Sequence, residues 1–346
     1  MLPFPLTCII DKDHNITMAY PGKIDVHHHV YPPVYTEALN RNGGDPSGWY
    51  IPPWTITLDD EICAKTGIST AILSCTAPGP SIEPKPQKAA LLARACNDFN
   101  ANLRATQPHR YGFFASVPDL SLDPPSALKE ISHALDTLRA DGIILVTSYG
   151  SPTPKYLGNP AFIPIWAALD ARKAVVFIHP THAAGSSQVS PLLPQPAFDY
   201  PHETGRTAID LITSGRLREN ASNCKIILSH GGGTLPSLID RVAGLMPFAP
   251  AGMSPGFSRD ELLDLARRFY YDTALSSGPV VLKGLFELLG REGRGRVLFG
   301  SDFPNAPEGS VGYFTRQLEE SGEVDMGELR ANALELFPRL KAGSGD

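Results

Sequence analysis

The chain contains few cysteines and no long hydrophobic run. Five cysteines occur among 346 residues, at positions 8, 63, 75, 96 and 224, and no two of them form a C-x-x-C pair. An odd number of cysteines without paired spacing argues against a disulfide framework, so free thiols in a reduced, cytoplasmic compartment are the simpler interpretation. No apolar run approaches the roughly 20 residues needed to cross a bilayer, and we therefore expect no membrane partner.

The sequence also lacks a basic cluster, an internal repeat and a low-complexity tract. Its net charge is -6 and its basic residues are scattered, which argues against a nucleic-acid partner. With 42% apolar residues, the chain can form one barrel-sized domain with added loops, but it is too short for a second full domain. We expect a single domain over residues 1–346, with an N-terminal extension at 1–22, a loop insertion at 31–56 and C-terminal helices at 305–346.

Apolar β-like segments alternate regularly with helical ones along the chain. The predicted strands are 23–29, 70–74, 111–117, 142–146, 174–178, 225–229, 269–272 and 297–299. The predicted helices are 58–65, 85–107, 126–139, 162–173, 202–214, 235–246, 258–268, 279–289, 313–320 and 326–337. Eight strands joined by helices predict an α/β fold, a parallel (β/α)8 TIM barrel. The apolar stretch 2–10 is expected to form a strand or hairpin that covers the barrel floor.

The first predicted strand ends in three consecutive histidines. Alternate strand residues point to the same face, so His27 and His29 can bind one metal ion while His28 faces away. A histidine run by itself is a weak signal, because such runs also occur on solvated loops. The interpretation as a metal site therefore depends on partners elsewhere in the chain.

Further polar residues follow other predicted strands, as His179, His230 and Asp302 do. Each of them alone is also compatible with a buried histidine or a turn residue, but all stand where parallel barrels assemble their active sites. Three imidazoles and one carboxylate suit a single divalent ion with an open position. Zinc is favoured and manganese is the alternative. The segment 143–147 offers no lysine for the carbamylated bridge of a two-metal site, which favours one metal per chain.

Together these motifs resemble the amidohydrolase superfamily over roughly residues 23–340. The closest branch is that of the metal-dependent decarboxylases related to aminocarboxymuconate-semialdehyde decarboxylase. The resemblance rests on Asp25-x-His27-x-His29, His179-Pro180, His230 with three glycines, Pro236 and Arg241 following, and Gly300-Ser301-Asp302-Phe303-Pro304. It implies that the metal ligands are His27, His29, His179 and Asp302. It also implies that His230 is an acid/base group beside them.

The resemblance further implies a homodimer that completes the active site. Arg241 matches an arginine that in the muconate-type relatives reaches across a dimer to the substrate carboxylate. An ordinary salt bridge within the chain is the alternative for this residue. Those relatives also carry an arginine in the loop after the first strand. This chain departs from them there, since Arg41 does not align convincingly, and an aliphatic semialdehyde diacid is therefore in doubt as substrate.

Aromatic residues in the loops suggest a flat ring as substrate instead. Trp54, in the run 49–54, and Phe198, in the run 198–201, resemble the subgroup that includes 6-methylsalicylate decarboxylases of polyketide and secondary metabolism. The alternative is that Trp49 and Trp54 only pack a long loop. The resemblance implies that the substrate is a small aromatic acid of the salicylate type. The products would be CO2 and a phenol. His182 and His202 are expected on loops at the active-site side of the barrel, and their roles and that of Arg206 stay unassigned.

Such a decarboxylation requires that the negative charge which develops in the ring is stabilised and that the ring carbon receives a proton. His230 and Asp302 are the candidate catalytic residues for delivering that proton, and the sequence does not choose between them. Hydrolysis of a lactone, ester or amide on the same barrel is the main alternative. A barrel that binds a metal or ligand without catalysis is a third possibility.

Overall fold

The computed structural model describes residues 8–10, 16–18, 22–182, 188–250 and 252–343. Eight parallel strands form one sheet in the order β12-β11-β10-β9-β6-β5-β4-β3. The strands are β3 (Lys23–His29), β4 (Ile68–Ser74), β5 (Tyr111–Ala115), β6 (Gly142–Val146), β9 (Val175–His179), β10 (Lys225–Leu228), β11 (Tyr270–Asp272) and β12 (Val297–Leu298). Two short antiparallel strands outside this sheet, β7 (Ser148–Tyr149) and β8 (Lys155–Tyr156), form a hairpin after β6.

The two edges of the sheet meet, so that the sheet closes into a barrel. The amide of Val26 donates to the carbonyl of Phe299 at 3.0 Å, and the amide of Asp302 donates to the carbonyl of His27 at 2.8 Å. These bonds connect β3 to the segment that follows β12. The predicted (β/α)8 barrel is confirmed.

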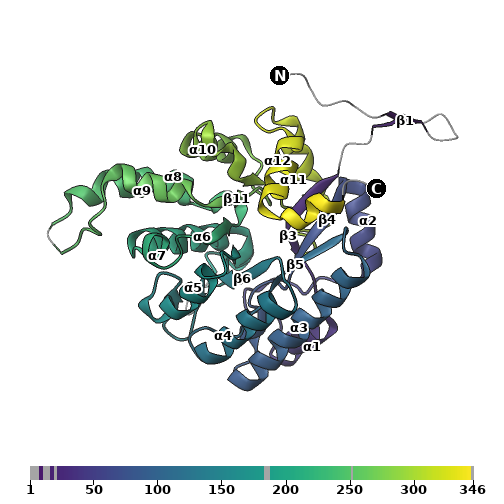
Figure 1. Cartoon of the computed structure of the whole chain (residues 1–346), viewed down its shortest axis with the longest axis horizontal. Helices are drawn as coiled ribbons and strands as arrows, with labels where there is room; N and C mark the ends of the chain where they lie inside the picture. Colours follow the sequence, from purple (N-terminus) through teal and green to yellow (C-terminus); the bar gives the residue numbers. More distant parts are fainter. Residues whose placement is uncertain (1–7, 11–15, 19–21, 183–187, 251, 344–346) are drawn as a thin grey trace.

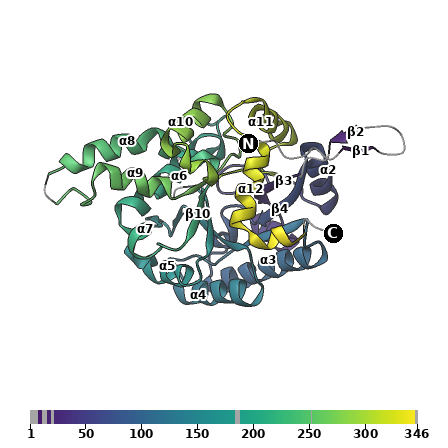
Figure 2. The same ribbon diagram turned by 45° about the horizontal axis from the view of Figure 1, so that its top comes forward.

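Helices surround the barrel (Figures 1 and 2). They are α1 (Pro33–Arg41), α2 (Ile56–Thr66), α3 (Pro86–Thr106), α4 (Pro124–Ser132), α5 (Ile163–Asp170), α6 (Gln195–Thr213), α7 (Arg216–Glu219), α8 (Leu235–Leu245), α9 (Arg259–Arg267), α10 (Pro279–Leu289), α11 (Glu308–Glu320) and α12 (Met326–Leu336). Both views show α8 and α9 side by side as an arm that extends away from the barrel. No helix in the described part of the chain is long and apolar enough to cross a membrane.

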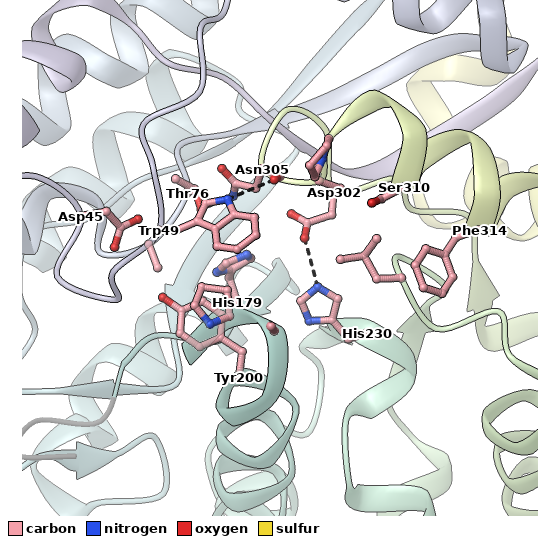
Figure 3. Close-up of a pocket in the computed structure, with 16 residues that line it drawn as sticks. Asp45, Trp49, Thr76, His179, Tyr200, His230, Asp302, Asn305, Ser310 and Phe314 are labelled. Atoms are coloured by element: carbon pink, nitrogen blue, oxygen red, sulfur yellow. Dashed lines mark hydrogen bonds and ion pairs between the residues drawn. The ribbon is translucent and has the colours of Figure 1, made fainter. Parts of the chain in front are cut away.

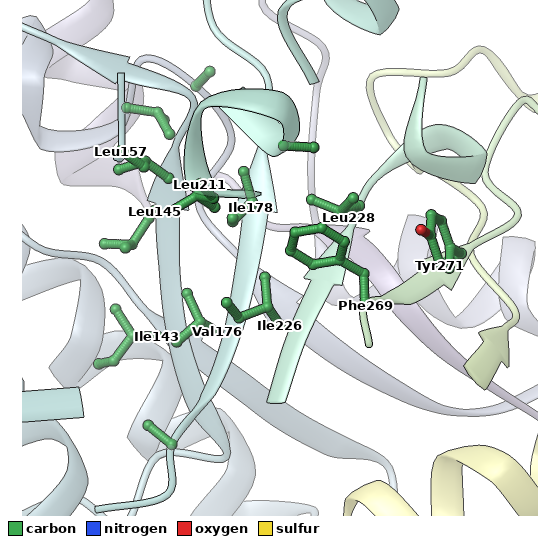
Figure 4. Packing of buried hydrophobic residues seen from close by; sticks show 14 of the residues in the cluster. Ile143, Leu145, Leu157, Val176, Ile178, Leu211, Ile226, Leu228, Phe269 and Tyr271 are labelled. Carbon is green, nitrogen blue, oxygen red and sulfur yellow. The ribbon is translucent and has the colours of Figure 1, made fainter. Parts of the chain in front are cut away.

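The strands are apolar on both faces because each face is buried. On β6, Ile144 points into the barrel interior, whereas Ile143 and Leu145 belong to the layer between strands and helices (Figure 4). This explains why the segment is a continuous apolar run rather than an alternating one. At one end of the interior, the ring of Phe337 after α12 lies 6.0 Å from that of Phe114. Side chains therefore fill the barrel and leave chemistry to its rim.

Three loop predictions change in the structure. The predicted loop insertion 31–56 contains α1, which begins with a proline at its first position, a residue suited to a helix start. The helix predicted over 58–65 begins earlier, as α2 at Ile56, because Thr55 caps it by accepting the amide of Leu58. Helix α6 begins at Gln195 and continues through Pro201, so part of the predicted loop before residue 202 is helical.

The described part of the N-terminal extension is the hairpin of β1 (Cys8–Ile10) and β2 (Ile16–Met18). The predicted strand or hairpin covered residues 2–10, and of these Cys8–Ile10 form one strand of the observed hairpin. Figures 1 and 2 both show the two strands clear of the barrel rather than across its floor. Residues 1–7, 11–15 and 19–21 of the extension lie outside the described residues.

Candidate metal and active site

Four side chains at the ends of three barrel segments converge on one point. The Nε2 atoms of His27 and His29 are 3.1 Å apart, and that of His179 lies 3.1 Å from the Nε2 of His29. The Oδ1 atom of Asp302 lies 3.3 Å from the first of these nitrogens and 3.1 Å from the second. The ligand atoms of all four residues are buried within 4.8 Å of one another. The structure thus brings together the four predicted metal ligands.

The outer nitrogen of each imidazole is turned toward an oxygen. The Nδ1 atom of His27 contacts the Asp272 carboxylate at 2.9 Å, and that of His179 contacts the Pro180 carbonyl at 2.7 Å. The Nδ1 atom of His29 lies 3.2 Å from the carbonyl of Ser74. These oxygens accept hydrogen bonds from the Nδ1–H groups of the neutral imidazoles, and in that tautomer the Nε2 lone pairs are directed at one another.

Such a cluster of lone pairs fits a cation. The Oδ1 atom of Asp302 is buried and accepts no hydrogen bond from the described residues. Three lone pairs and an unpartnered carboxylate oxygen repel each other unless a positive charge lies between them. The donor set of three imidazoles and one carboxylate suits a divalent transition metal, so the residues present fit the predicted ion.

The charges of the cluster also favour a cation. Burial lowers the pKa of His27, but the carboxylates of Asp272 and Asp302 outweigh it and raise that pKa to about 10. Burial raises the pKa of Asp302, but His27 and His230 hold it well below its usual range. Burial and the neighbouring imidazoles lower the pKa of His179 well below its usual value. A proton and a divalent ion therefore compete for His27, whereas His179 is free to bind metal.

His230 lies beside the cluster without being one of its four members. Its Nε2 atom is 3.5 Å from the Oδ2 atom of Asp302, and both residues line the same cavity (Figure 3). The backbone of both residues adopts a positive φ, 57° at His230 and 62° at Asp302, a region that non-glycine residues seldom occupy. Close packing shapes these turns, since a Cβ at Gly300 would come within 2.8 Å of the Cβ of His27.

The middle histidine of the first strand joins a second buried network. His28 contacts the Asp25 carboxylate at 2.9 Å and the Asp59 carboxylate at 3.1 Å. Burial lowers the pKa of His28, yet these carboxylates raise it to about 9. The other oxygen of Asp25 accepts the amides of His27 at 3.0 Å and Ser301 at 3.1 Å. The network therefore ties the first strand to the loop that carries Asp302, which holds the ligands in register.

An open cavity of about 170 Å³ adjoins the cluster. Its walls are mainly apolar and aromatic, with a few polar groups: Asp45, Trp49, Thr76, Ala77, His179, Pro196, Ala197, Tyr200, His230, Leu275, Asp302, Asn305, Ala306, Pro307, Ser310 and Phe314. The indole of Trp49 forms one wall, fixed by a 3.1 Å hydrogen bond from its Nε1 atom to the carbonyl of Asn305. No lysine or arginine is found among these described lining residues.

The predicted substrate-binding residues lie elsewhere. The ring of Trp54 packs against that of Phe99 at 6.1 Å, and Trp54 does not line the cavity. Phe198 is 45% exposed and contacts His202, also outside the cavity walls. Arg241 is exposed on α8 and forms no ion pair with the residues that the structure describes. Of the two tryptophans in the loop insertion, Trp49 is the one that reaches the cavity.

The structure also shows the surroundings of the residues to which the sequence assigned no role. His182 is partly buried, and this burial lowers its pKa against the opposing effect of Asp45. Arg206 lies 3.6 Å from Glu203, with its guanidinium 5.2 Å from the centre of the Tyr156 ring. Outside the site, Arg41 pairs with Glu83, so it supplies no charge to the cavity.

Sequence reasoning missed Asp272, whose carboxylate orients the predicted metal ligand His27. Its other oxygen accepts the backbone amide of His230 at 3.0 Å, so one carboxylate positions two site residues. The signal was present, because Asp272 ends strand β11 just as the other site residues end or follow their strands. The cavity residues Asn305 and Leu275 were missed as well, and neither belongs to a motif.

The comparisons with known proteins agree with this geometry. The amidohydrolase family model matches residues 24–339, and the chain belongs to that family. It is 56% identical over 327 residues to a 6-methylsalicylic acid decarboxylase of Penicillium expansum, covering 92% of this chain and 97% of that one. It is 55% identical over 325 residues to the 6-methylsalicylic acid decarboxylase acuB of Aspergillus aculeatus, with the same coverage.

A solved structure supports the same assignment. The chain resembles the crystal structure of an amidohydrolase II with a TM-score of 0.80 and 28% sequence identity. The match covers 91% of this chain and 99% of that one. The superposition extends over the whole barrel, so the likeness is not confined to the metal-binding motifs.

Proposed function

We propose that the chain is a metal-dependent decarboxylase of a salicylate-type hydroxybenzoate and that 6-methylsalicylate is its substrate. The observation that carries this proposal is the cluster of His27, His29, His179 and Asp302 at a mainly apolar cavity of ring-binding character. Two relatives at 56% and 55% identity act on 6-methylsalicylic acid by name, which favours decarboxylation over the hydrolase alternative. Metabolism of a polyketide acid follows as the proposed context.

The four ligands would hold one divalent ion, with zinc favoured and manganese as the alternative. Such an ion, when bound, supplies positive charge to the substrate carboxylate and its ortho oxygen and so relieves the charge that develops in the ring. The cavity itself offers no lysine or arginine among its described lining residues. The chain's own contribution is to orient the acid between Trp49 and the opposite wall and to exclude water.

His230 and Asp302 are proposed to act as one acid/base pair that delivers the proton to the ring carbon. Their side chains are 3.5 Å apart, and both face the cavity. The Nδ1 atom of His230 is buried without a partner among the described residues, so its ring can exchange a proton only on the side of the Asp302 carboxylate and the cavity. A proton can pass along this contact in either direction as the reaction proceeds.

An acid with a free ortho hydroxyl should react much faster than the same acid with that oxygen methylated. We expect 6-methylsalicylate to be decarboxylated, with 2-methoxy-6-methylbenzoate slower by about 100-fold or more, because methylation removes both an oxygen donor and a proton. The measurement is CO2 release together with identification of the phenol. Equal rates for the two acids contradict the proposed binding mode, and release of an acid without CO2 from an ester would favour the hydrolase.

A homodimer with Arg241 acting on the partner's site is also part of the proposal. The guanidinium is exposed on α8, lacks an ion-pair partner in the described part of its own chain, and the cavity lacks a cation. The arm of α8 and α9 carries exposed apolar side chains, with Leu245 57%, Phe248 86% and Met253 69% exposed. These features suit an interface between two copies of the chain.

Mixing two inactive variants tests this arrangement. A His230→Ala chain combined with an Arg241→Ala chain should recover about a quarter of the wild-type activity. Half of the random dimers are mixed, and one site in each mixed dimer has its own His230 and the partner's Arg241. Subunit exchange is confirmed by mass spectrometry. No recovery after complete exchange would place Arg241 in its own site or outside both.

Four of the five cysteines are described at side-chain level, namely Cys63, Cys75, Cys96 and Cys224, and all are free. Burial raises the pKa of Cys224 to about 12, which keeps this thiol protonated. We propose a cytoplasmic location on this basis, since reducing compartments maintain free thiols.

A further inference from the structure

The cavity has two chemically different ends. Trp49 and Tyr200 lie on one side of His230 and Asp302, whereas Phe314 lies on the other side (Figure 3). Leu275 and Phe314 line neighbouring parts of the wall, because Ser277, two residues after Leu275, donates to the carbonyl of Phe314 at 2.8 Å. We call the part of the wall formed by Leu275 and Phe314 the apolar end. Ser310, which Figure 3 shows beside Phe314, contributes a hydroxyl group to the wall. A flat acid bound at the cluster would therefore meet different surfaces on its two sides.

Leu275 occupies the apolar end in an unfavourable backbone conformation. Its φ is 51°, and the amide of Ser276 donates to the carbonyl of Thr273 at 3.1 Å, so Leu275 is the third residue of a tight turn. Glycine or asparagine is favoured there, because a leucine Cβ crowds the following carbonyl. A strained residue in a ligand cavity indicates that its side chain has a use there.

The turn that carries Leu275 is anchored to the cluster. Asp272 contacts His27 through Oδ2 at 2.9 Å, and its Oδ1 atom accepts the amides of Ala274 at 2.9 Å and His230 at 3.0 Å. On the other side, the Ser277 hydroxyl donates to the carbonyl of Phe314 at 2.8 Å. The isobutyl group is therefore held at a fixed place relative to both His230 and Phe314.

We infer that Leu275 is a specificity-determining residue. It selects an alkyl group at the second ring position ortho to the carboxylate, the one that does not carry the phenolic oxygen. The inference rests on the proposed function and adds the residue that recognises the substituent. Moving a methyl group from water to this apolar end lowers the free energy of binding. A hydroxyl group of nearly the same size loses its water there and meets the aliphatic side chain of Leu275 and the ring of Phe314 instead.

Two substitutions at Leu275 test the inference without straining the turn. Asparagine has a similar branched shape and tolerates a positive φ, and glycine adopts it freely. Leu275→Asn should lower the ratio of kcat/KM for 6-methylsalicylate to kcat/KM for 2,6-dihydroxybenzoate by about tenfold. Leu275→Gly should lower the ratio of 6-methylsalicylate to salicylate by about fivefold or more, because the contact with the methyl group is lost.

The control is Leu122→Asn, the same exchange at an exposed leucine that does not line the cavity and is expected to leave both ratios unchanged. If wild-type protein decarboxylates the three acids and both Leu275 variants keep both ratios within about twofold, the inference is overturned while the proposed function stands. If wild-type protein decarboxylates none of them, the proposed function fails and the inference fails with it.

Discussion

A His179→Ala variant is expected to lose nearly all of its metal and its activity. Wild-type protein should hold about one divalent ion per chain, and the variant well below that, because one of three converging imidazoles is removed. Decarboxylation should fall by more than about 100-fold, since even changes to residues that only support a ligand cost 10- to 100-fold. Elemental analysis of the purified proteins measures the metal, and CO2 release measures activity.

A matched variant separates this effect from a general effect of histidine replacement. His109 is exposed, lies outside the cluster, and offers only its backbone carbonyl to Thr70. The His109→Ala variant should retain its metal and its activity. Full metal occupancy in a His27→Ala/His179→Ala double variant would rule out the proposed ligand set.

The second large effect is expected for His230→Gln, which should lower kcat by about 10²- to 10⁴-fold while metal content stays near one ion per chain. Glutamine keeps a polar group in the cavity but cannot exchange a proton as imidazole does. Metal content should be preserved because His230 is not one of the four residues whose ligand atoms converge. The two measurements therefore distinguish an acid/base residue from a ligand.

Combining the substitutions adds a further check on the proposed pair. If His230 and Asp302 act as one unit, an Asp302→Asn substitution in the His230→Gln background should cost much less than in the wild-type background. Loss of metal from the His230→Gln protein would contradict the acid/base assignment. Because Asp302 is also a proposed metal ligand, the metal content of each Asp302→Asn protein is measured beside its activity. Additive losses of activity per bound metal ion would mean that the residues act independently.

Much of the site could be predicted because its residues obey a simple geometric rule. In a parallel barrel, the carboxyl ends of all strands meet at one rim, so polar residues that follow apolar runs come together. His27 and His29 share a strand face, and His179 and Asp302 end or follow strands of the same sheet. Local sequence patterns therefore contain enough information to place these side chains.

The conformations of the loops could not be predicted from the local sequence pattern. The aromatic motifs of the insertion favoured Trp54, but the structure places Trp49 at the cavity through a hydrogen bond to Asn305, which is 256 residues away. Helix α6 extends into a region without visible periodicity, and Leu275 reaches the cavity from a turn that would favour glycine. Such positions depend on contacts between distant segments, which no short window of sequence contains.

The sequence by itself predicted the barrel, the convergence of the four candidate metal ligands and the branch of the family, because strand-end chemistry and hydrophobic patterning are local properties of the chain. Only the tertiary structure decided which aromatic residue forms the cavity wall, which carboxylate orients His27, and which end of the cavity is apolar. Asp272 shows the physical reason, since it is one residue whose role comes from contacts with His27 and His230, 245 and 42 positions away.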